Sequence, residues 1–142
     1  METWGEVQFV FEVHQKVLFK HCDPAGIVFY PRYFEIMNDC VEAFFDHIGC
    51  AFEDFHQTGA VPTARINAEF LRPSRHGDQL RLCLAIQKMG KTSLHLEIDT
   101  YCRDEKRMVF SSTLVNVDTK GRPQPWSHPL RDAFVPHIKL EG

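Results

Sequence analysis

Apolar residues recur every three or four positions between Tyr33 and Ile48, which predicts a long amphipathic helix. We predict this helix over residues 32–48, with Pro31 at its first position and Gly49 ending it. At 1.5 Å per residue it would be about 25 Å long. The apolar positions are Tyr33, Met37, Cys40, Val41, Phe44 and Ile48, widened by Phe34, Ile36 and Phe45. Because they cover more than half of the circumference, other parts of the chain must surround the helix.

Alternating apolar and polar residues predict strands in much of the remaining chain. The five strands that we expect are Val7–Phe19, Ala64–Phe70, Leu80–Ile86, Leu94–Ile98 and Met108–Asp118. The last of these is apolar on both faces in places, so we expect it inside the sheet. Residues 49–60 are expected to form a connecting loop, and residues 129–135 either a short helix or an irregular segment.

The last three strands are joined by short turns and should therefore form an antiparallel meander. One sheet of about five strands has to cover one long apolar helix, which follows the first strand. The pattern thus predicts a single α+β domain over residues 1–142, a curved antiparallel sheet of about five strands wrapped around a long central helix. The even-numbered residues of strands two to four should face the helix.

Composition narrows the class of protein. Charged residues make up 25% of the chain and hydrophobic residues 44%, which is typical of a soluble globular domain. The formal net charge of −3 does not favour a nucleic-acid partner. The N-terminus lacks the basic and apolar regions of a signal peptide, and no apolar stretch approaches the ~20 residues that cross a bilayer. We therefore expect a cytoplasmic protein with no membrane partner.

The cysteines and histidines show no spacing of a disulfide framework or a metal site. The cysteines are odd in number and form no C-x-x-C pair: Cys22, Cys40, Cys50, Cys83 and Cys102. This indicates reduced thiols. The eight histidines show neither H-E-x-x-H nor paired Cys/His spacing, so we expect no metal ion.

A turn with an acidic residue comes directly before the predicted helix: His21-Cys22-Asp23-Pro24-Ala25-Gly26-Ile27-Val28-Phe29-Tyr30-Pro31. Taken alone, Asp23 in a Pro/Gly turn indicates an Asx turn, in which the carboxylate bonds its own backbone. Residues 23–31, however, closely resemble the signature of the 4-hydroxybenzoyl-CoA thioesterase family. There an aspartate precedes Pro-Ala-Gly-Ile-Val, and an aromatic residue with Tyr-Pro opens the helix. The order of the predicted elements also resembles that family, whose fold is the hotdog fold.

Two positions differ from relatives of that family. His21 stands where the closest relatives often carry an acidic residue. The Tol-Pal-associated thioesterases usually carry Tyr-His where this chain has Tyr30-Pro31, which places the chain nearer the aroyl-CoA branch. The acyl group itself stays open between aromatic, short-chain and long-chain.

Thioester hydrolysis needs a nucleophile or general base, and donors for the oxyanion that develops on the carbonyl oxygen. Asp23 can supply the first, either by attacking the thioester or by deprotonating water. The free N–H groups at the start of the helix can supply the second, and because Pro31 has none, we expect Tyr30 to be the donor. Gly26 would allow a backbone or ligand to approach closely. The resemblance implies the same roles for Asp23 and the Tyr30 backbone.

Other polar residues near the turn have less distinctive patterns. We interpret Cys22 as a small buried residue rather than a nucleophile. His21 would either tune Asp23, contact substrate or be an ordinary histidine at a strand end. Another branch of hotdog thioesterases places its catalytic glutamate on the helix, but Glu35, Asp39 and Glu42 fall on the polar side of this helix. We expect them to face solvent or another subunit.

The resemblance implies an acyl-CoA substrate, whose phosphates would need cations on an outer rim. Residues near strand ends provide candidates, His76 among them, although ordinary surface charge explains each equally well. Asn67 matches a polar position near the family's active site. The candidate substrate-binding residues are His21, Pro31, Asn67, Arg72, Arg75, Lys88 and Lys91.

We therefore expect an acyl-CoA thioesterase that yields a free acid and CoA without a metal or cofactor, coenzyme A being part of the substrate. The resemblance implies an active site between two protomers whose sheets join edge to edge, which would also remove an exposed strand edge. A homodimer is then the minimum, and a homotetramer is compatible with the fold. Two alternatives stay open: a non-catalytic acyl-CoA-binding hotdog protein, and a hotdog dehydratase or hydratase acting on acyl thioesters, whose motif we do not find.

Overall fold

The computed structural model describes residues 10–139 of the 142-residue chain. Its main sheet has the strand order β1-β4-β5-β6-β3, and all neighbouring strands are antiparallel. These strands are β1 (Phe11–Lys16), β3 (Thr63–Phe70), β4 (Gln79–Met89), β5 (Ser93–Cys102) and β6 (Glu105–Val115). A second sheet pairs β2 (Gly59–Ala60) with β7 (Val117–Asp118). The helices are α1 (Tyr30–His47), α2 (Phe52–Phe55) and α3 (His128–Phe134), with 3-10 turns at Phe19–His21 and Val135–His137.

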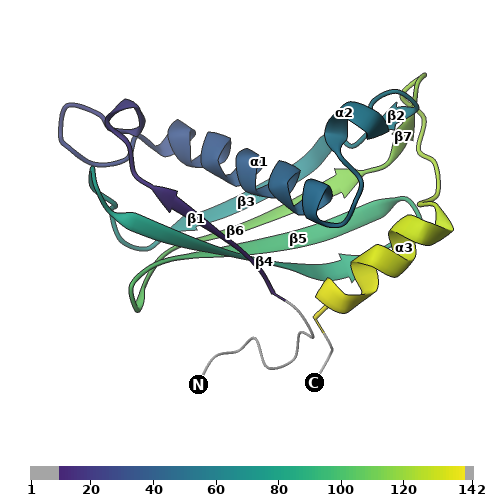
Figure 1. Ribbon diagram of the computed structural model, residues 1–142. Helices are drawn as coiled ribbons and strands as arrows, with labels where there is room; N and C mark the ends of the chain where they lie inside the picture. The colour runs from purple at the N-terminus through teal and green to yellow at the C-terminus, as the bar shows by residue number, and fades with distance from the viewer. Residues whose placement is uncertain (1–9, 140–142) are drawn as a thin grey trace.

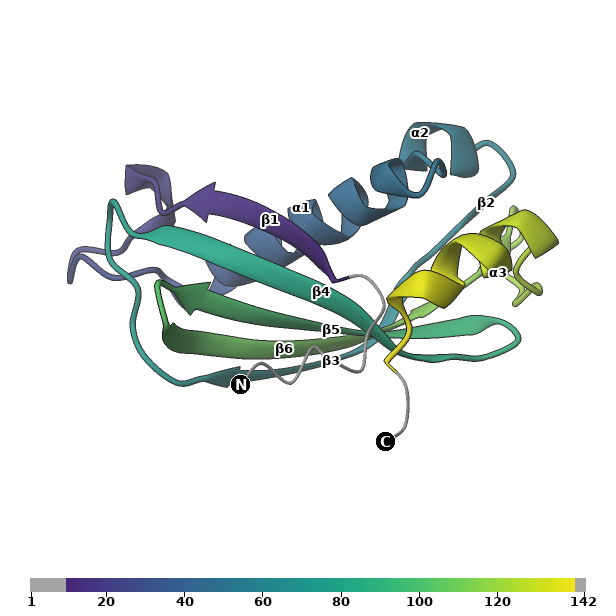
Figure 2. The ribbon, with the colours of Figure 1, turned by 60° about the horizontal axis from the view of Figure 1, so that its bottom comes forward.

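The long helix α1 lies along one face of the curved sheet (Figures 1 and 2). This confirms the predicted α+β arrangement, including the antiparallel meander β4-β5-β6 and the position of β6 inside the sheet. Within residues 10–139, no helix has the length and apolarity needed to cross a bilayer.

The helix α1 begins at Tyr30, two residues before the predicted start, so Pro31 lies in its first turn. Gly49 follows the helix end with a φ of +81°, a conformation in which glycine carries no steric cost. The buried side chains match the predicted apolar face and are Tyr33, Ile36, Met37, Cys40, Val41, Phe44 and Phe45.

The core lies between α1 and the inner face of the sheet. The even-numbered residues from 80 to 86 in β4 and from 94 to 98 in β5 are fully buried in one cluster with α1, which confirms the predicted parity: Leu80, Leu82, Leu84, Ile86, Leu94, Leu96 and Ile98. Burying one such side chain contributes roughly 1.5–3 kcal/mol relative to leaving it exposed. The same face of β3 is less covered, because β3 is an edge strand.

The first strand is shorter than predicted. Residues 7–9 lie outside the described chain, and β1 ends at Lys16, which pairs with Gln79 at the start of β4. Beyond that point, Val17 bonds the turn that precedes β4. Phe19 then enters a 3-10 turn with its side chain 81% exposed. The alternating pattern therefore continued past the end of the partner strand.

The structure differs from the prediction in segment 49–60 and in the last strand, because both are determined by contacts with residues far away in the sequence. The segment 49–60, predicted as a loop, contains α2 and β2, which are held by the ring of Phe52 packed against Phe45 at 5.1 Å and by pairing with β7. The predicted fifth strand is divided at Asn116, whose N–H donates to the Thr92 carbonyl. The uncertain segment 129–135 is helical as α3.

Candidate active site

The stretch before α1 folds back on itself as a narrow antiparallel loop, which we call the motif loop (residues 21–29). The Phe29 N–H donates to the His21 carbonyl, and the Asp23 N–H donates to the Ile27 carbonyl, both at 2.9 Å. The Gly26 N–H donates to the Asp23 carbonyl at 2.9 Å and closes the turn. These bonds carry Asp23 to the tip of a loop that leads directly into α1.

Gly26 has a φ of +82°, in the left-handed region that favours glycine. A Cβ built at this position would meet no heavy atom within 4 Å. Within this chain the glycine is therefore required by the backbone conformation of the turn and not by a close neighbour. The predicted approach of a ligand to Gly26 stays a prediction.

The half-buried carboxylate of Asp23 forms the Asx turn that its sequence setting indicates. Its Oδ1 accepts a hydrogen bond from the Ala25 N–H at 2.9 Å. Among residues 10–139 this is the one hydrogen bond to the carboxylate. The turn therefore orients the side chain through one oxygen and leaves Oδ2 available to a substrate or water. Forming an Asx turn is thus compatible with a catalytic role for the same carboxylate.

The start of α1 presents a backbone donor next to this turn. The Arg32 N–H already donates to the Phe29 carbonyl at 2.8 Å, and Pro31 has no N–H. The Tyr30 N–H has no acceptor within residues 10–139. A free N–H at the positive end of an 18-residue helix favours negative charge on any atom placed against it.

His21 is buried at the base of the motif loop, with 5% of its surface exposed. Its Nδ1 accepts the Leu18 N–H at 2.9 Å, which places the ring proton on Nε2. Burial lowers the pKa of His21 below its usual value, and the adjacent Lys20 lowers it further. His21 is therefore neutral near pH 7 and holds the 3-10 turn that precedes Asp23.

A second segment lies against the motif loop, residues 71–78 between β3 and β4, which we call the bracing loop. The Val28 N–H donates to the Ser74 carbonyl at 2.8 Å, and Ile27 pairs with Arg75. The imidazole of His76 lies 6.0 Å from the exposed ring of Phe19. The bracing loop thus places Arg75 beside the motif loop and His76 beside the 3-10 turn that precedes it.

Aromatic side chains are exposed around the start of α1. Phe29, Tyr30 and Phe70 are 47%, 60% and 48% exposed. Their rings form a chain, with centroids 5.6 Å apart for Phe29–Tyr30 and 6.4 Å apart for Tyr30–Phe70. A cavity of about 450 Å³ opens along the neighbouring edge of β3, and Phe34 and Ile66 are among its lining residues. This surface is suited to a flat or apolar group.

A profile of the thioesterase-like superfamily matches residues 17–134, which include both loops and α1. The chain belongs to this superfamily. A 1,4-dihydroxy-2-naphthoyl-CoA hydrolase from Nostoc punctiforme is 29% identical over 82 residues, covering 56% of this chain and 55% of that protein. The chain therefore spans about half the length of this relative.

Solved structures with a similar arrangement of helices and strands agree on the fold. A 1,4-dihydroxy-2-naphthoyl-CoA thioesterase from Synechocystis has a TM-score of 0.83 at 15% identity, covering 89% of this chain and 96% of that one. A Staphylococcus aureus protein solved in complex with CoA has a TM-score of 0.87 at 15% identity, covering 96% and 90%. These likenesses show the hotdog fold. The prediction is thus confirmed at the level of the thioesterase-like superfamily. Membership of the narrower 4-hydroxybenzoyl-CoA thioesterase family stays a prediction.

In this thioesterase-like chain, the predicted site residues fall into two groups. Those on the motif loop, the first turn of α1 and the bracing loop are brought together: His21, Asp23, Gly26, Tyr30, Pro31, Arg72, Arg75 and His76. The other three lie elsewhere. Asn67 is on the outer side of the sheet, where it lines a small polar pocket with Arg65 and His95. Lys88 and Lys91 lie at the far end of β4, about 30 Å from its start at the bracing loop.

Cys22, Glu35 and Asp39 make local contacts or face solvent in the described chain. The Cys22 thiol is half-buried and lies 3.6 Å from the Leu18 carbonyl oxygen. Glu35 is exposed and pairs with Arg32 at 2.8 Å, and Asp39 is exposed on the same helix. Residues 10–139 contain no group of three or more His, Cys, Asp or Glu side chains placed to hold a metal ion.

Proposed function

We propose that this protein is an acyl-CoA thioesterase that converts an acyl-CoA and water into a free acid and CoA. One observation carries the proposal: the loop that orients the Asp23 carboxylate also leads into the free Tyr30 N–H at the start of α1. A base or nucleophile and an oxyanion donor are thereby supplied by one continuous segment. Membership of the thioesterase-like superfamily supports a thioester as the substrate.

In the proposed reaction the thioester oxygen accepts the Tyr30 N–H, and the helix end stabilises the charge that develops there. Asp23 then acts in one of two ways. As nucleophile it forms a mixed anhydride, expels CoA thiolate and is released when water cleaves the anhydride. As general base it removes a proton from water, which attacks the carbonyl carbon directly. Either way the acyl–sulfur bond breaks, and no cofactor is consumed.

We propose an aromatic acyl group. The exposed rings of Phe29, Tyr30 and Phe70 and the cavity beside them support this, because offset or edge contacts between rings favour a planar substrate. The relatives from Nostoc punctiforme and Synechocystis carry the name of an aromatic acyl-CoA as substrate. Arg72, Arg75 and His76 would contact the CoA phosphates at the rim.

The site is proposed to be completed by a second copy of this chain. β3 is an edge strand that pairs with β6 on one side and has no neighbouring strand on the other within residues 10–139, and Ile66 and Phe70 on it are each 48% exposed. Edge-to-edge pairing of two β3 strands would cover these side chains and close the 450 Å³ cavity. Light scattering should give the mass of a dimer or tetramer, and Ile66→Lys should shift it towards the monomer. A wild-type monomer at micromolar concentration would contradict this.

The function is tested by thiol release from a panel of aroyl-, short-chain and long-chain acyl-CoAs. We expect turnover with aroyl-CoAs, and a loss in kcat of at least about 10²-fold in Asp23→Asn. Asp104→Asn, an exposed acid at the β5–β6 turn, serves as the matched control and should keep full activity. Equal activity of Asp23→Asn and wild type would remove Asp23 from the mechanism. CoA binding without turnover of any substrate would favour the non-catalytic acyl-CoA-binding alternative.

A further inference from the structure

We propose that Arg107 is a positioning residue for the reaction: it fixes the bracing loop, and through it the motif loop that carries Asp23 and the Tyr30 N–H. This inference rests on the proposed function for its catalytic consequence. Its structural part, the control of the motif loop from β6, can be measured without a substrate.

Arg107 occupies an irregular position in the sheet. The β5–β6 ladder pairs Thr100 with Met108 and then Tyr101 with Lys106, so that Arg107 has no partner in β5. An extra residue of this kind bends the strand and redirects its side chain, and such bulges are frequent next to active sites. The sequence pattern placed residues 103–107 in a charged turn, whereas the bulge turns Arg107 back towards the bracing loop.

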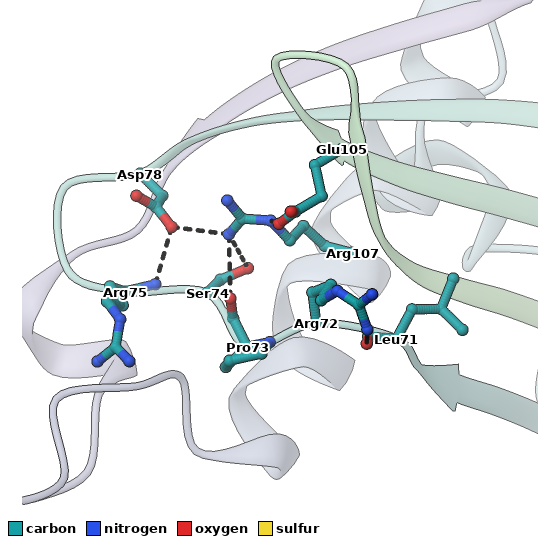
Figure 3. A network of polar contacts seen from close by, with 8 residues as sticks. All are labelled: Leu71, Arg72, Pro73, Ser74, Arg75, Asp78, Glu105 and Arg107. Atoms are coloured by element: carbon teal, nitrogen blue, oxygen red, sulfur yellow. Dashed lines mark hydrogen bonds and ion pairs between the residues drawn. The ribbon is translucent and has the colours of Figure 1, made fainter.

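The guanidinium gathers three acceptors from the bracing loop (Figure 3). Its Nη1 donates to the Pro73 carbonyl at 3.1 Å, to the Ser74 hydroxyl at 3.1 Å and to the Asp78 carboxylate at 2.8 Å. A Glu105 oxygen lies 2.6 Å from Nε as an ion pair, outside the angles of a hydrogen bond. The Arg107 side chain is 13% exposed and that of Asp78 28%.

The backbone of the same residue holds the beginning of the bracing loop. The Arg107 carbonyl accepts the Leu71 N–H at 2.9 Å and the Arg72 N–H at 3.2 Å. At the loop's other end, the Asp78 carboxylate that receives Arg107 also accepts the Arg75 N–H at 2.9 Å. One residue of β6 therefore ties both ends of the loop.

The charges of Arg107 and Asp78 favour a lasting ion pair between them. Partial burial alone would raise the pKa of Asp78, but hydrogen bonds from the Arg75 N–H and the Arg107 guanidinium outweigh it and lower that pKa. Asp78 is thus ionised at neutral pH. A guanidinium is always charged and carries several donors in one plane, whereas a lysine ammonium acts as a point charge.

The connection from the bracing loop to the catalytic groups is short. Ser74 is fully buried, its hydroxyl faces Arg107, and its carbonyl accepts the Val28 N–H at 2.8 Å. The neighbouring Ile27 pairs with Arg75 and accepts the Asp23 N–H. Two residues after Val28 comes Tyr30. A shift of the Ser74 carbonyl would therefore move both the carboxylate and the oxyanion donor.

The test compares Arg107→Met and Arg107→Lys with wild type on the best substrate of the panel. We expect Arg107→Met to lower kcat by about 10- to 100-fold with KM changed less than about threefold, because displacements near 1 Å can cost 10²-fold in rate. Arg107→Lys should recover part of the lost kcat, since its ammonium keeps the charge but reaches fewer acceptors. If Arg107 instead bound CoA directly, its substitution would change KM and the product inhibition by CoA.

Lys106→Met is the matched control. Lys106 is adjacent in β6, but its ammonium pairs with the buried Asp99 at 3.2 Å and not with the bracing loop. This variant should lose stability and keep kcat at temperatures where it is folded. If Arg107→Met and Lys106→Met lose the same fraction of kcat, the role of Arg107 is structural only, and the proposal is overturned.

Amide hydrogen exchange tests the structural link independently of activity. Arg107→Lys is used because it keeps the charge and should disturb folding less than Arg107→Met. In this variant the amides of Val28 and Asp23 should exchange at least about tenfold faster than in wild type. Their exchange should not change in Lys106→Met. Unchanged exchange at both amides would reject the proposal. If wild type hydrolyses no acyl-CoA while exchange responds as expected, the proposed function fails and the link from Arg107 to the motif loop stands.

Discussion

The two ends of α1 carry aromatic residues in similar number and use them in opposite ways. At the beginning, Phe29 and Tyr30 are 47% and 60% exposed, whereas at the end Phe44 and Phe45 are fully buried. The end is fixed by ring packing, with the Phe45 centroid 6.0 Å from that of Phe134. The beginning has little packing of this kind on its outer side.

Polar contacts replace packing at the beginning of α1. The motif loop is held from behind by the bracing loop, and the bracing loop by Arg107 (Figure 3). A surface that must stay open to a ligand cannot be fixed by burying its own side chains. Hydrogen bonds and an ion pair in the bracing loop supply the rigidity instead.

The largest effect on stability is expected at the end of α1. Phe44→Ala should lower the free energy of unfolding by about 3–5 kcal/mol, because it removes a ring that packs against Phe11 and His137 and leaves a cavity. Urea unfolding followed by circular dichroism measures this loss. A loss below about 1 kcal/mol would mean that side-chain packing stabilises the end of the helix no more than its beginning.

An intermediate effect should depend on pH. The pKa of Asp78 is lowered in the folded state, so its contribution to stability is present above its unfolded value of 3.8 and is lost as the pH falls through the folded pKa. Asp78→Asn should cost at most about 1 kcal/mol near neutral pH after solvent screening. The difference from wild type, measured by urea unfolding, should shrink as the pH falls below 3.8 and the carboxylate becomes protonated in the folded state. A constant difference at all pH values would argue against the ion pair.

The smallest effect on stability is expected at the exposed beginning. Phe29→Ala should change the free energy of unfolding by no more than about 0.5 kcal/mol, because its ring is half exposed. It should nevertheless lower turnover of an aroyl-CoA several-fold by removing one ring of the exposed chain. Normal turnover, or a loss of stability comparable to that of Phe44→Ala, would remove the contrast between the two ends.

Local patterns predicted the features that depend on neighbours in sequence. The spacing of Tyr33, Met37 and Phe44 predicted α1, because a helix repeats every 3.6 residues whatever surrounds it. Strand parity likewise predicted that Leu82 and Leu96 face the core. The Asp-Pro-Ala-Gly sequence predicted an acidic turn directly before the helix, and the Asx turn of Asp23 confirms it, while the chemical roles of Asp23 and Tyr30 stay predictions.

Features that depend on distant pairing could not be predicted in this way. The position of Arg75 beside Ile27 depends on a bridge between two loops that lie almost fifty residues apart in the chain, and no local pattern indicates it. Arg107 looked like one charge in a turn, since a bulge appears only when two strands are in register. The short strand β2 needs β7 as its partner, nearly sixty residues further along the chain.

The described chain begins and finishes at one place. Val10 and Phe11 line the same cavity as Pro136 and His137, next to His47 at the end of α1. The whole length of the helix separates this place from Asp23. A bulky group attached near Val10 or Pro136 would therefore leave the loop tip that carries Asp23 facing the solution.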